Sequence, residues 1–188
     1  MPAAMERRFA KSVPAFLAGL QAGMLGVWWM LAWMGASAVW QRGSFWTPEN
    51  LMASVFYGNA AIRPGFGAST VSGLALYALL YSLLGAGFAI AVGDRLPRPR
   101  LALASIAFAL CWYYVAFHLL AKAVAPPIPL LDAERNTVLG HLVYGAVLAR
   151  FPLYLPHAAD APVASAPEIE SPASEPHVSE ARVDTPEQ

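Results

Sequence analysis

The sequence predicts an all-α integral membrane protein: a four-helix bundle of two parallel-repeat helical hairpins, with one short interfacial helix and a disordered C-terminal tail. The first observation is composition, because 57% of residues are hydrophobic and 13% charged, whereas soluble domains are about 45–50% apolar. The second is four apolar runs, each near the ~20 residues that cross a ~30 Å hydrocarbon core. In lipid a chain of this kind satisfies its backbone hydrogen bonds as helices, so each run is predicted to be one.

The chain begins with a short basic N-terminus, residues 1–12, and the first span follows at about 13–40. This run is long enough to cross the membrane with some tilt. A cleaved signal peptide is an alternative, because Ala36-Ser37-Ala38 has the small-x-small form of a cleavage site. However, a signal core is typically about 7–15 residues, which is shorter than this run.

A short interfacial helix is predicted over residues 48–57, in the connection after the first span. Thr47 can cap it, Pro48 suits the first helical position, Glu49 complements the helix dipole and Gly58 can end it. One face should lie on the membrane surface or on the ends of the spans. Its apolar residues recur at helical spacing: Leu51, Met52, Val55 and Phe56.

The other three spans are predicted at about 70–92, 101–124 and 137–155, and together with the first they make a membrane domain over residues 13–155. Prolines interrupt the chain between them. Asn136 is the expected cap of the last span.

Positive charges predict the orientation of the spans. Arginines and lysines are enriched in cytoplasmic loops, so the richer side is assigned to the cytoplasm. Both termini are then predicted to be cytoplasmic. Seven basic residues fall on that side, Arg7, Arg8, Lys11, Arg95, Arg98, Arg100 and Arg150, against four on the other, Arg42, Arg63, Lys122 and Arg135.

Residues 156–188 are rich in Ala, Pro, Ser and Glu and carry seven acids against one arginine. A segment of this composition cannot bury enough apolar surface to offset the entropy of folding. It is predicted to be a disordered acidic tail, which either solubilises the chain or binds a partner.

An internal repeat relates the second and fourth spans. Thr70-Val71-x-Gly73-x-x-x-Tyr77 matches Thr137-Val138-x-Gly140-x-x-x-Tyr144. Residues 28–33 of the first span (Trp-Trp-Met-Leu-Ala-Trp) likewise resemble residues 112–117 of the third (Trp-Tyr-Tyr-Val-Ala-Phe). The two spans of each pair cross in the same direction, so the chain is predicted to contain two parallel hairpins. Chance similarity between apolar segments is the alternative.

Small residues are expected to form the contacts between helices, because lipid offers no hydrophobic drive for association. The spacing occurs in Gly19-x-x-x-Gly23 of the first span and Gly85-x-x-x-Ala89 of the second. These positions predict grooves in which two backbones approach closely.

Two intramembrane histidines, His118 and His141, mark the candidate site. They are predicted at matching depth in the outer half of the third and fourth spans, and ionisable residues there are functional candidates. Asn50 and Tyr57 of the interfacial helix arrive on the same side and could form a lid. Three further residues lie within about one turn of a histidine: Tyr114, Lys122 and Tyr144.

Three interpretations of the histidines remain open. They could hydrogen-bond within the bundle, they could be axial ligands of a b-type haem, or they could line a polar pocket for a solute or proton. Trp28, Trp29 and Trp33 could stack on a haem or a quinone, or face lipid. No cofactor is predicted, with haem b the alternative, and no metal site is expected.

An enzyme is not predicted, because the sequence offers no nucleophile triad, phosphate loop or paired membrane carboxylates. Its single cysteine, Cys111, excludes an intrachain disulfide. The expected partners are the lipid bilayer and either a second copy of the chain or another membrane protein, with no nucleic acid.

Residues 13–155, with the segment Gly-His-x-x-Tyr-Gly at Gly140–Gly145, resemble small uncharacterised four-span proteins of bacterial inner membranes. The resemblance implies a bacterial inner membrane as the location, and it implies no known activity. The sequence therefore predicts a non-enzymatic accessory, scaffold or small transport component, with a haem- or quinone-associated redox protein as the alternative.

Overall fold

The computed structural model describes residues 2–93 and 95–155, with side chains from residue 12 onward, and every element in that part is helical. The predicted all-α class is therefore confirmed for the described residues, and the predicted tail lies outside them. The elements are α1 (Pro2–Trp40), α2 (Thr47–Tyr57), η1 (Gly58–Ala61), α3 (Ala68–Val92), α4 (Arg98–Tyr114), η2 (Val115–Leu120), α5 (Ala121–Val124), α6 (Pro127–Leu131), α7 (Glu134–Leu148) and η3 (Phe151–Tyr154).

Within the described residues, three helices are long and apolar enough to cross a membrane. They are Ser12–Trp40 of α1, α3, and the continuous helix Arg98–Val124 formed by α4, η2 and α5. Their bounds agree within three residues with the first three predicted spans. These helices support a membrane location for the protein.

The predicted fourth span is shorter than expected. α7 has 15 residues, about 22 Å at ~1.5 Å per residue, which falls short of a ~30 Å hydrocarbon core. It ends at Leu148 because the chain turns at Ala149 and Arg150 before the short 3₁₀ helix η3. A fourth crossing of the membrane therefore stays a prediction.

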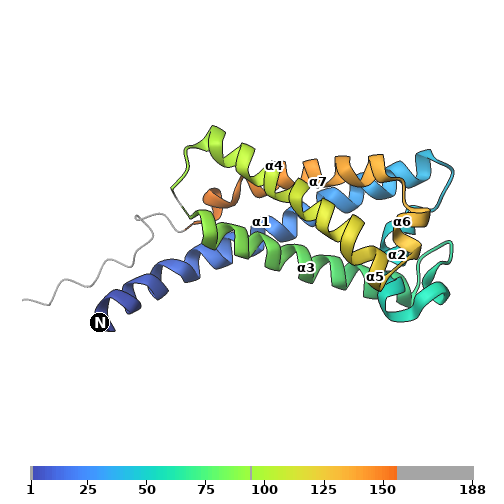
Figure 1. The fold of residues 1–188 in the computed structure, drawn as a ribbon, viewed down its shortest axis with the longest axis horizontal. Coiled ribbons are helices and arrows are strands. Elements are labelled where there is room, and N and C mark those ends of the chain that lie inside the picture. Colours follow the sequence, from blue (N-terminus) through green and yellow to red (C-terminus); the bar gives the residue numbers. More distant parts are fainter. Residues whose placement is uncertain (1, 94, 156–188) are drawn as a thin grey trace, which may run out of the picture. The chain divides into compact units, whose positions relative to one another are not determined.

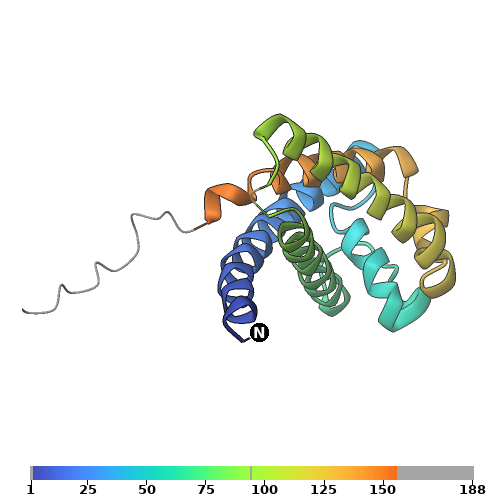
Figure 2. The same ribbon diagram turned by 60° about the vertical axis from the view of Figure 1, so that its left-hand side comes forward.

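The long helices lie roughly along one direction, with α2, α5 and α6 gathered at one end (Figure 1). α1 packs against α3 and α7, and α7 also packs against α4. α3 and α4 scarcely contact each other, so the order of packing is α3, α1, α7, α4. The turned view in Figure 2 shows the same separation of α3 from α4. One side of the helical assembly is therefore left unclosed.

Small residues make the contact between α1 and α3, as the sequence predicts. A Cβ atom added to Gly19 would lie 2.5 Å from the Cβ of Ala89 and from the backbone oxygen of Gly85. A Cβ added to Gly85 would lie 2.8 Å from the Cα of Gly23. Larger side chains at these positions would push the two helices apart.

The helix predicted over residues 48–57 is α2, whose bounds agree to within one residue. Its place at the membrane interface stays a prediction, and two predicted caps are wrong. Thr47 is the first residue of α2, and the residue at its cap, Trp46, makes no side-chain capping bond. Asn136 lies inside the first turn of α7, which begins at Glu134. The turn before α7 is held instead by Thr137, whose hydroxyl donates to Oδ2 of Asp132 at 2.7 Å.

The face of α2 that packs inward differs in part from the predicted apolar stripe. Glu49, Asn50 and Ser54 are buried, whereas Phe56 is exposed. The reason is a close approach of α2 to α3: a Cβ added to Gly73 would collide with the backbone oxygen of Glu49. The polar residues beside this contact are enclosed by it.

The predicted repeat stays a prediction, because equivalent residues have different surroundings. Gly73 faces the backbone of α2, whereas a Cβ on Gly140 would meet the side chains of Met30 and Met34 of α1 at 3.2 Å. α1 packs on both α3 and α7, but α4 packs mainly on α7. The two predicted hairpins are thus packed unequally.

Candidate functional site

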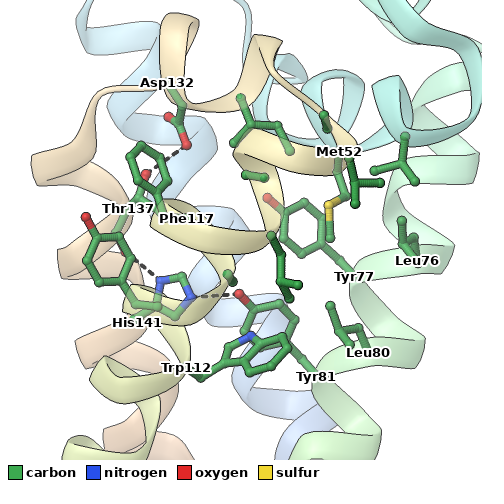
Figure 3. A pocket seen from close by; sticks show the side chains of 18 residues that line it. Met52, Leu76, Tyr77, Leu80, Tyr81, Trp112, Phe117, Asp132, Thr137 and His141 are labelled. Carbon is green, nitrogen blue, oxygen red and sulfur yellow. Dashed lines mark hydrogen bonds between the residues drawn. The ribbon is translucent and has the colours of Figure 1, made fainter.

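A pocket of about 250 Å³ lies between α3 on one side and α4, η2 and α5 on the other, with α2 and α6 at one end and α7 behind (Figure 3). It occupies the place where α3 and α4 fail to meet. Its lining is mostly apolar. The residues are Met52, Val55, Leu76, Tyr77, Leu80, Tyr81, Trp112, Tyr113, Ala116, Phe117, Leu120, Ala121, Val124, Ala125, Ile128, Asp132, Thr137 and His141.

A π-helical segment, η2, forms part of the pocket wall. Its wider turn shifts the side chains that follow it relative to an α-helix, and such segments are frequent at functional sites. Ala116, Phe117 and Leu120 of η2 line the pocket. The ring of Phe117 stacks on that of Tyr113, with centroids 5.5 Å apart.

His141 is buried behind the pocket, with both ring nitrogens hydrogen-bonded. Nδ1 donates to the backbone oxygen of Thr137 at 2.7 Å, because a carbonyl can only accept. In a neutral ring Nε2 then accepts from the hydroxyl of Tyr81, also at 2.7 Å. Figure 3 shows the ring held between these two partners. The imidazole is therefore fixed in one tautomer and has no nitrogen free.

Asp132 lies at the rim of the pocket, where α6 ends. Its Oδ2 accepts the hydroxyl of Thr137, and no basic side chain of the described residues lies within ion-pair distance of it. Burial raises the pKa of the Asp132 carboxyl, and the hydrogen bond from Thr137 partly opposes that effect. The carboxylate is thus a partly enclosed negative charge with no paired cation in the described part of the chain.

Five aromatic side chains contribute to the pocket wall: Tyr77, Tyr81, Trp112, Tyr113 and Phe117. The indole nitrogen of Trp112 is buried and makes no hydrogen bond of ordinary geometry among the described residues, but it faces the hydroxyl of Tyr81 closely enough to interact with it. The pocket therefore combines ring faces with few polar atoms.

The structure places the two predicted histidines in different surroundings. His118 lies 3.3 Å from Oε1 of Glu134 and 3.4 Å from the hydroxyl of Tyr113. The ring of Tyr113 contacts both histidines, with centroids 5.7 Å from His118 and 5.3 Å from His141. Of the two, only His141 lines the pocket.

The other predicted site residues lie outside the pocket. Tyr144 is buried and donates to the backbone oxygen of Tyr81 at 2.7 Å. Tyr114 is exposed and contacts the ring of His118, with centroids 5.0 Å apart. Lys122 is exposed on α5. These residues support helix packing or face outward rather than surround a ligand.

The predicted lid residues fasten α2 to its neighbours. Asn50 donates to the backbone oxygens of Arg63 and Gly65 and accepts from the hydroxyl of Thr70 at 2.8 Å. The hydroxyl of Tyr57 lies 3.0 Å from that of Ser72. Neither side chain lines the pocket, although α2 itself contributes two lining residues. Opening of α2 as a lid remains a prediction.

The arrangement does not fit a haem held by two histidines. Nε2 of His141 is bonded to Tyr81, and Nε2 of His118 faces Tyr113 and Glu134. Axial ligation requires a free imidazole nitrogen from each histidine on opposite faces of one iron. Within the described residues, no group of three or more His, Cys, Asp or Glu could hold a metal ion.

The tryptophans of the first span also lie away from the pocket. Trp28, Trp29 and Trp33 are between 41% and 59% exposed on α1, and none of them lines the cavity. This exposure suits contact with lipid in a membrane protein.

No protein family, curated protein or solved structure matches this sequence.

Several pocket residues were missed by sequence reasoning, although four of them form two pairs with a simple spacing. Tyr77 and Tyr81 are four residues apart, as are Tyr113 and Phe117, so each pair lies on one helix face. That spacing could have indicated two aromatic faces directed at each other. Asp132 gave no comparable signal, because an acid in a loop between spans is usually solvated.

Proposed function

We propose that this protein is a four-span protein of a bacterial inner membrane that acts without covalent chemistry, as an accessory or small transport component. Its activity is to hold a small lipophilic molecule in the pocket between α3 and α4. The observation that carries the proposal is the mostly apolar cavity of about 250 Å³ at the unclosed side of the helices.

The size and lining of the cavity support a ligand rather than trapped water. A single water needs roughly 10–15 Å³ of such volume and two to four polar partners. This cavity is far larger, and its polar groups are few. Pockets for drug-sized molecules are typically apolar with a few placed polar groups and measure about 300–1,000 Å³. The cavity of about 250 Å³ lies just below that range and therefore suits a smaller ligand.

The orientation proposed here places the pocket in the outer half of the membrane. The clustering of positive charge on one side favours cytoplasmic termini. The end of the molecule that carries α2, α5 and α6 (Figure 1) then faces outward, and the pocket lies beneath α2 and α6.

A binding measurement on the detergent-purified full chain tests the proposed function. An uncharged apolar probe, tert-butylbenzene, is expected to raise the melting temperature in a concentration-dependent way, because a ligand that binds only the folded state stabilises it. Ala116→Phe fills the pocket and is expected to abolish the effect. Ala107→Phe, the same change on the exposed face of α4, is the matched control and is expected to retain it.

The proposed function is contradicted if tert-butylbenzene leaves the melting temperature of the native chain unchanged. It is also contradicted if both phenylalanine variants respond to the probe as the native chain does, since the probe would then act outside the pocket.

A further inference from the structure

The formal charge in the lining of the pocket is of one sign, negative. Asp132 is the sole formally charged residue in its lining within the described part of the chain, and no lysine or arginine is present there. His141 also lines the pocket, and both of its nitrogens are already hydrogen-bonded. A ligand that entered would therefore meet one negative charge and no positive one.

The carboxylate of Asp132 has room for a partner. Two donors reach it, the hydroxyl of Thr137 and the backbone amide of Ala133, whereas an ionised carboxylate offers about four acceptor sites. A partly buried charge is costly unless it is paired. Glu134, two residues later, differs in this respect because it contacts both His118 and Tyr113.

The ring faces beside Asp132 suit the same kind of ligand. An aromatic ring carries negative charge on its face and attracts a cation within about 6 Å, most strongly for tryptophan and tyrosine. The wall contains Tyr77, Tyr81, Trp112, Tyr113 and Phe117. Such rings also supply apolar area for the uncharged part of a ligand.

We propose that the ligand of this pocket is a lipophilic cation, a small ammonium compound with an aromatic or alkyl body. Its charged end lies at Asp132, and its apolar body lies among the aromatic rings between α3 and α4. This inference rests on the proposed function and adds the charge of the ligand to it.

Two isosteric probes isolate the effect of charge. Phenyltrimethylammonium carries a quaternary nitrogen where tert-butylbenzene has a carbon, so the two molecules differ mainly in charge. Their dissociation constants are measured by titration calorimetry on the full chain in an uncharged detergent, corrected for partition into empty micelles. The cation is expected to bind at least about tenfold more tightly than the hydrocarbon.

Substitutions at two neighbouring acids show which carboxylate binds the cationic probe. Asp132→Asn keeps the shape of the side chain and an acceptor for Thr137. It is expected to weaken the binding of phenyltrimethylammonium about tenfold and to leave the affinity for tert-butylbenzene unchanged. Glu134→Gln removes the same charge two residues further along, at the start of α7, but the side chain of Glu134 is 61% exposed and does not line the pocket. It is expected to leave the affinity for both probes within about twofold.

The possible outcomes separate the two proposals. If both probes bind equally well and Asp132→Asn has no effect, the proposal that the ligand is a cation is wrong, while the proposed pocket and its function stand. Equal losses for Asp132→Asn and Glu134→Gln also overturn it, because the cation would then sense surface charge only. Failure of both probes to bind, with Ala116→Phe indistinguishable from the native chain, contradicts the proposed function itself.

Discussion

Buried polar residues in this protein differ in how completely they are hydrogen-bonded. Asn50 uses its amide and its carbonyl oxygen to join α2 to the segment before α3 and to the first turn of that helix. His141 is equally satisfied. Glu49 is only 1% exposed, and its Oε2 has no partner in the described part of the chain. These differences lead to two predictions about single side chains.

Glu49 should make stability fall as pH rises. Burial raises its pKa from 4.5 to about 7, and a backbone hydrogen bond partly opposes this. Between about pH 4.5 and 7 the folded state therefore holds a proton that the unfolded state has released, so the free energy of unfolding falls across that window and levels above it. Burial also raises the pKa of Asp132, so this residue likewise makes the free energy of unfolding fall as pH rises.

Melting temperatures between pH 4.5 and 8 test this prediction. The native chain is expected to lose stability across the window, and Glu49→Gln is expected to lose distinctly less, because the amide has no proton to release. Glu134→Gln is the control and should follow the native curve. A Glu49→Gln curve parallel to the native one would show that Glu49 does not titrate in this way.

His141 and His118 should differ in their contribution to stability. His141→Ala leaves the hydroxyl of Tyr81 without its acceptor and opens a cavity, which together should cost about 2–4 kcal/mol. His118 is partly exposed and its contacts are long, so His118→Ala should cost less than about 1 kcal/mol. Thermal unfolding in detergent measures both, and equal losses would contradict the different roles given to the two residues.

At the scale of helices, close backbone approaches hold the bundle together. α3 offers a matched pair of glycines for testing this. Gly73 lies against the backbone of α2, whereas nothing lies within 4 Å of a Cβ added to Gly87. Gly73→Ala should therefore destabilise the protein by about 1–3 kcal/mol through overpacking.

Gly87→Ala is the control for that prediction. Alanine favours a helix over glycine by up to about 1 kcal/mol, so this variant should match or exceed the native stability. Thermal unfolding of both variants checks the pair. If Gly73→Ala were as stable as Gly87→Ala, the conclusion that α2 packs tightly on α3 at Gly73 would be wrong.

The helices were predictable from sequence to different degrees, for physical reasons. The first three spans could be predicted because each is a long apolar run that ends near glycine or proline, and these are local features of the sequence. The end of α7 was missed because the chain beyond Arg150 is apolar again, and hydropathy does not separate a helix from the 3₁₀ turn Phe151–Tyr154. The π-helical segment η2 likewise leaves no pattern in the sequence.

The polar contacts of the candidate site were less predictable than the helices. His141 was identified correctly as a buried ionisable residue, but its partner Tyr81 lies 60 residues away. Pairing of that kind depends on how α3 and α7 lie, which hydropathy does not specify. The separation of α3 from α4, and hence the pocket, has the same tertiary origin.

At the scale of the whole molecule, the proposed arrangement depends on the number of membrane crossings. Three helices could cross by length and composition, and the proposal adds α7 as the fourth. α7 packs between α1 and α4 and buries Gly140, His141, Tyr144 and Leu148. α7 has 15 residues and lies among longer apolar helices. A helix of this length can cross the membrane where the bilayer is locally thinned.

A topology measurement tests the four-span arrangement most directly. Alkaline phosphatase, which is active only outside the cytoplasm, is fused after Leu155, with fusions after Gly43 and Leu96 as outer and inner controls. Four crossings predict an inactive reporter after Leu155, as after Leu96, and an active one after Gly43. Activity after Leu155 equal to that after Gly43 would mean three crossings and would contradict the proposed arrangement.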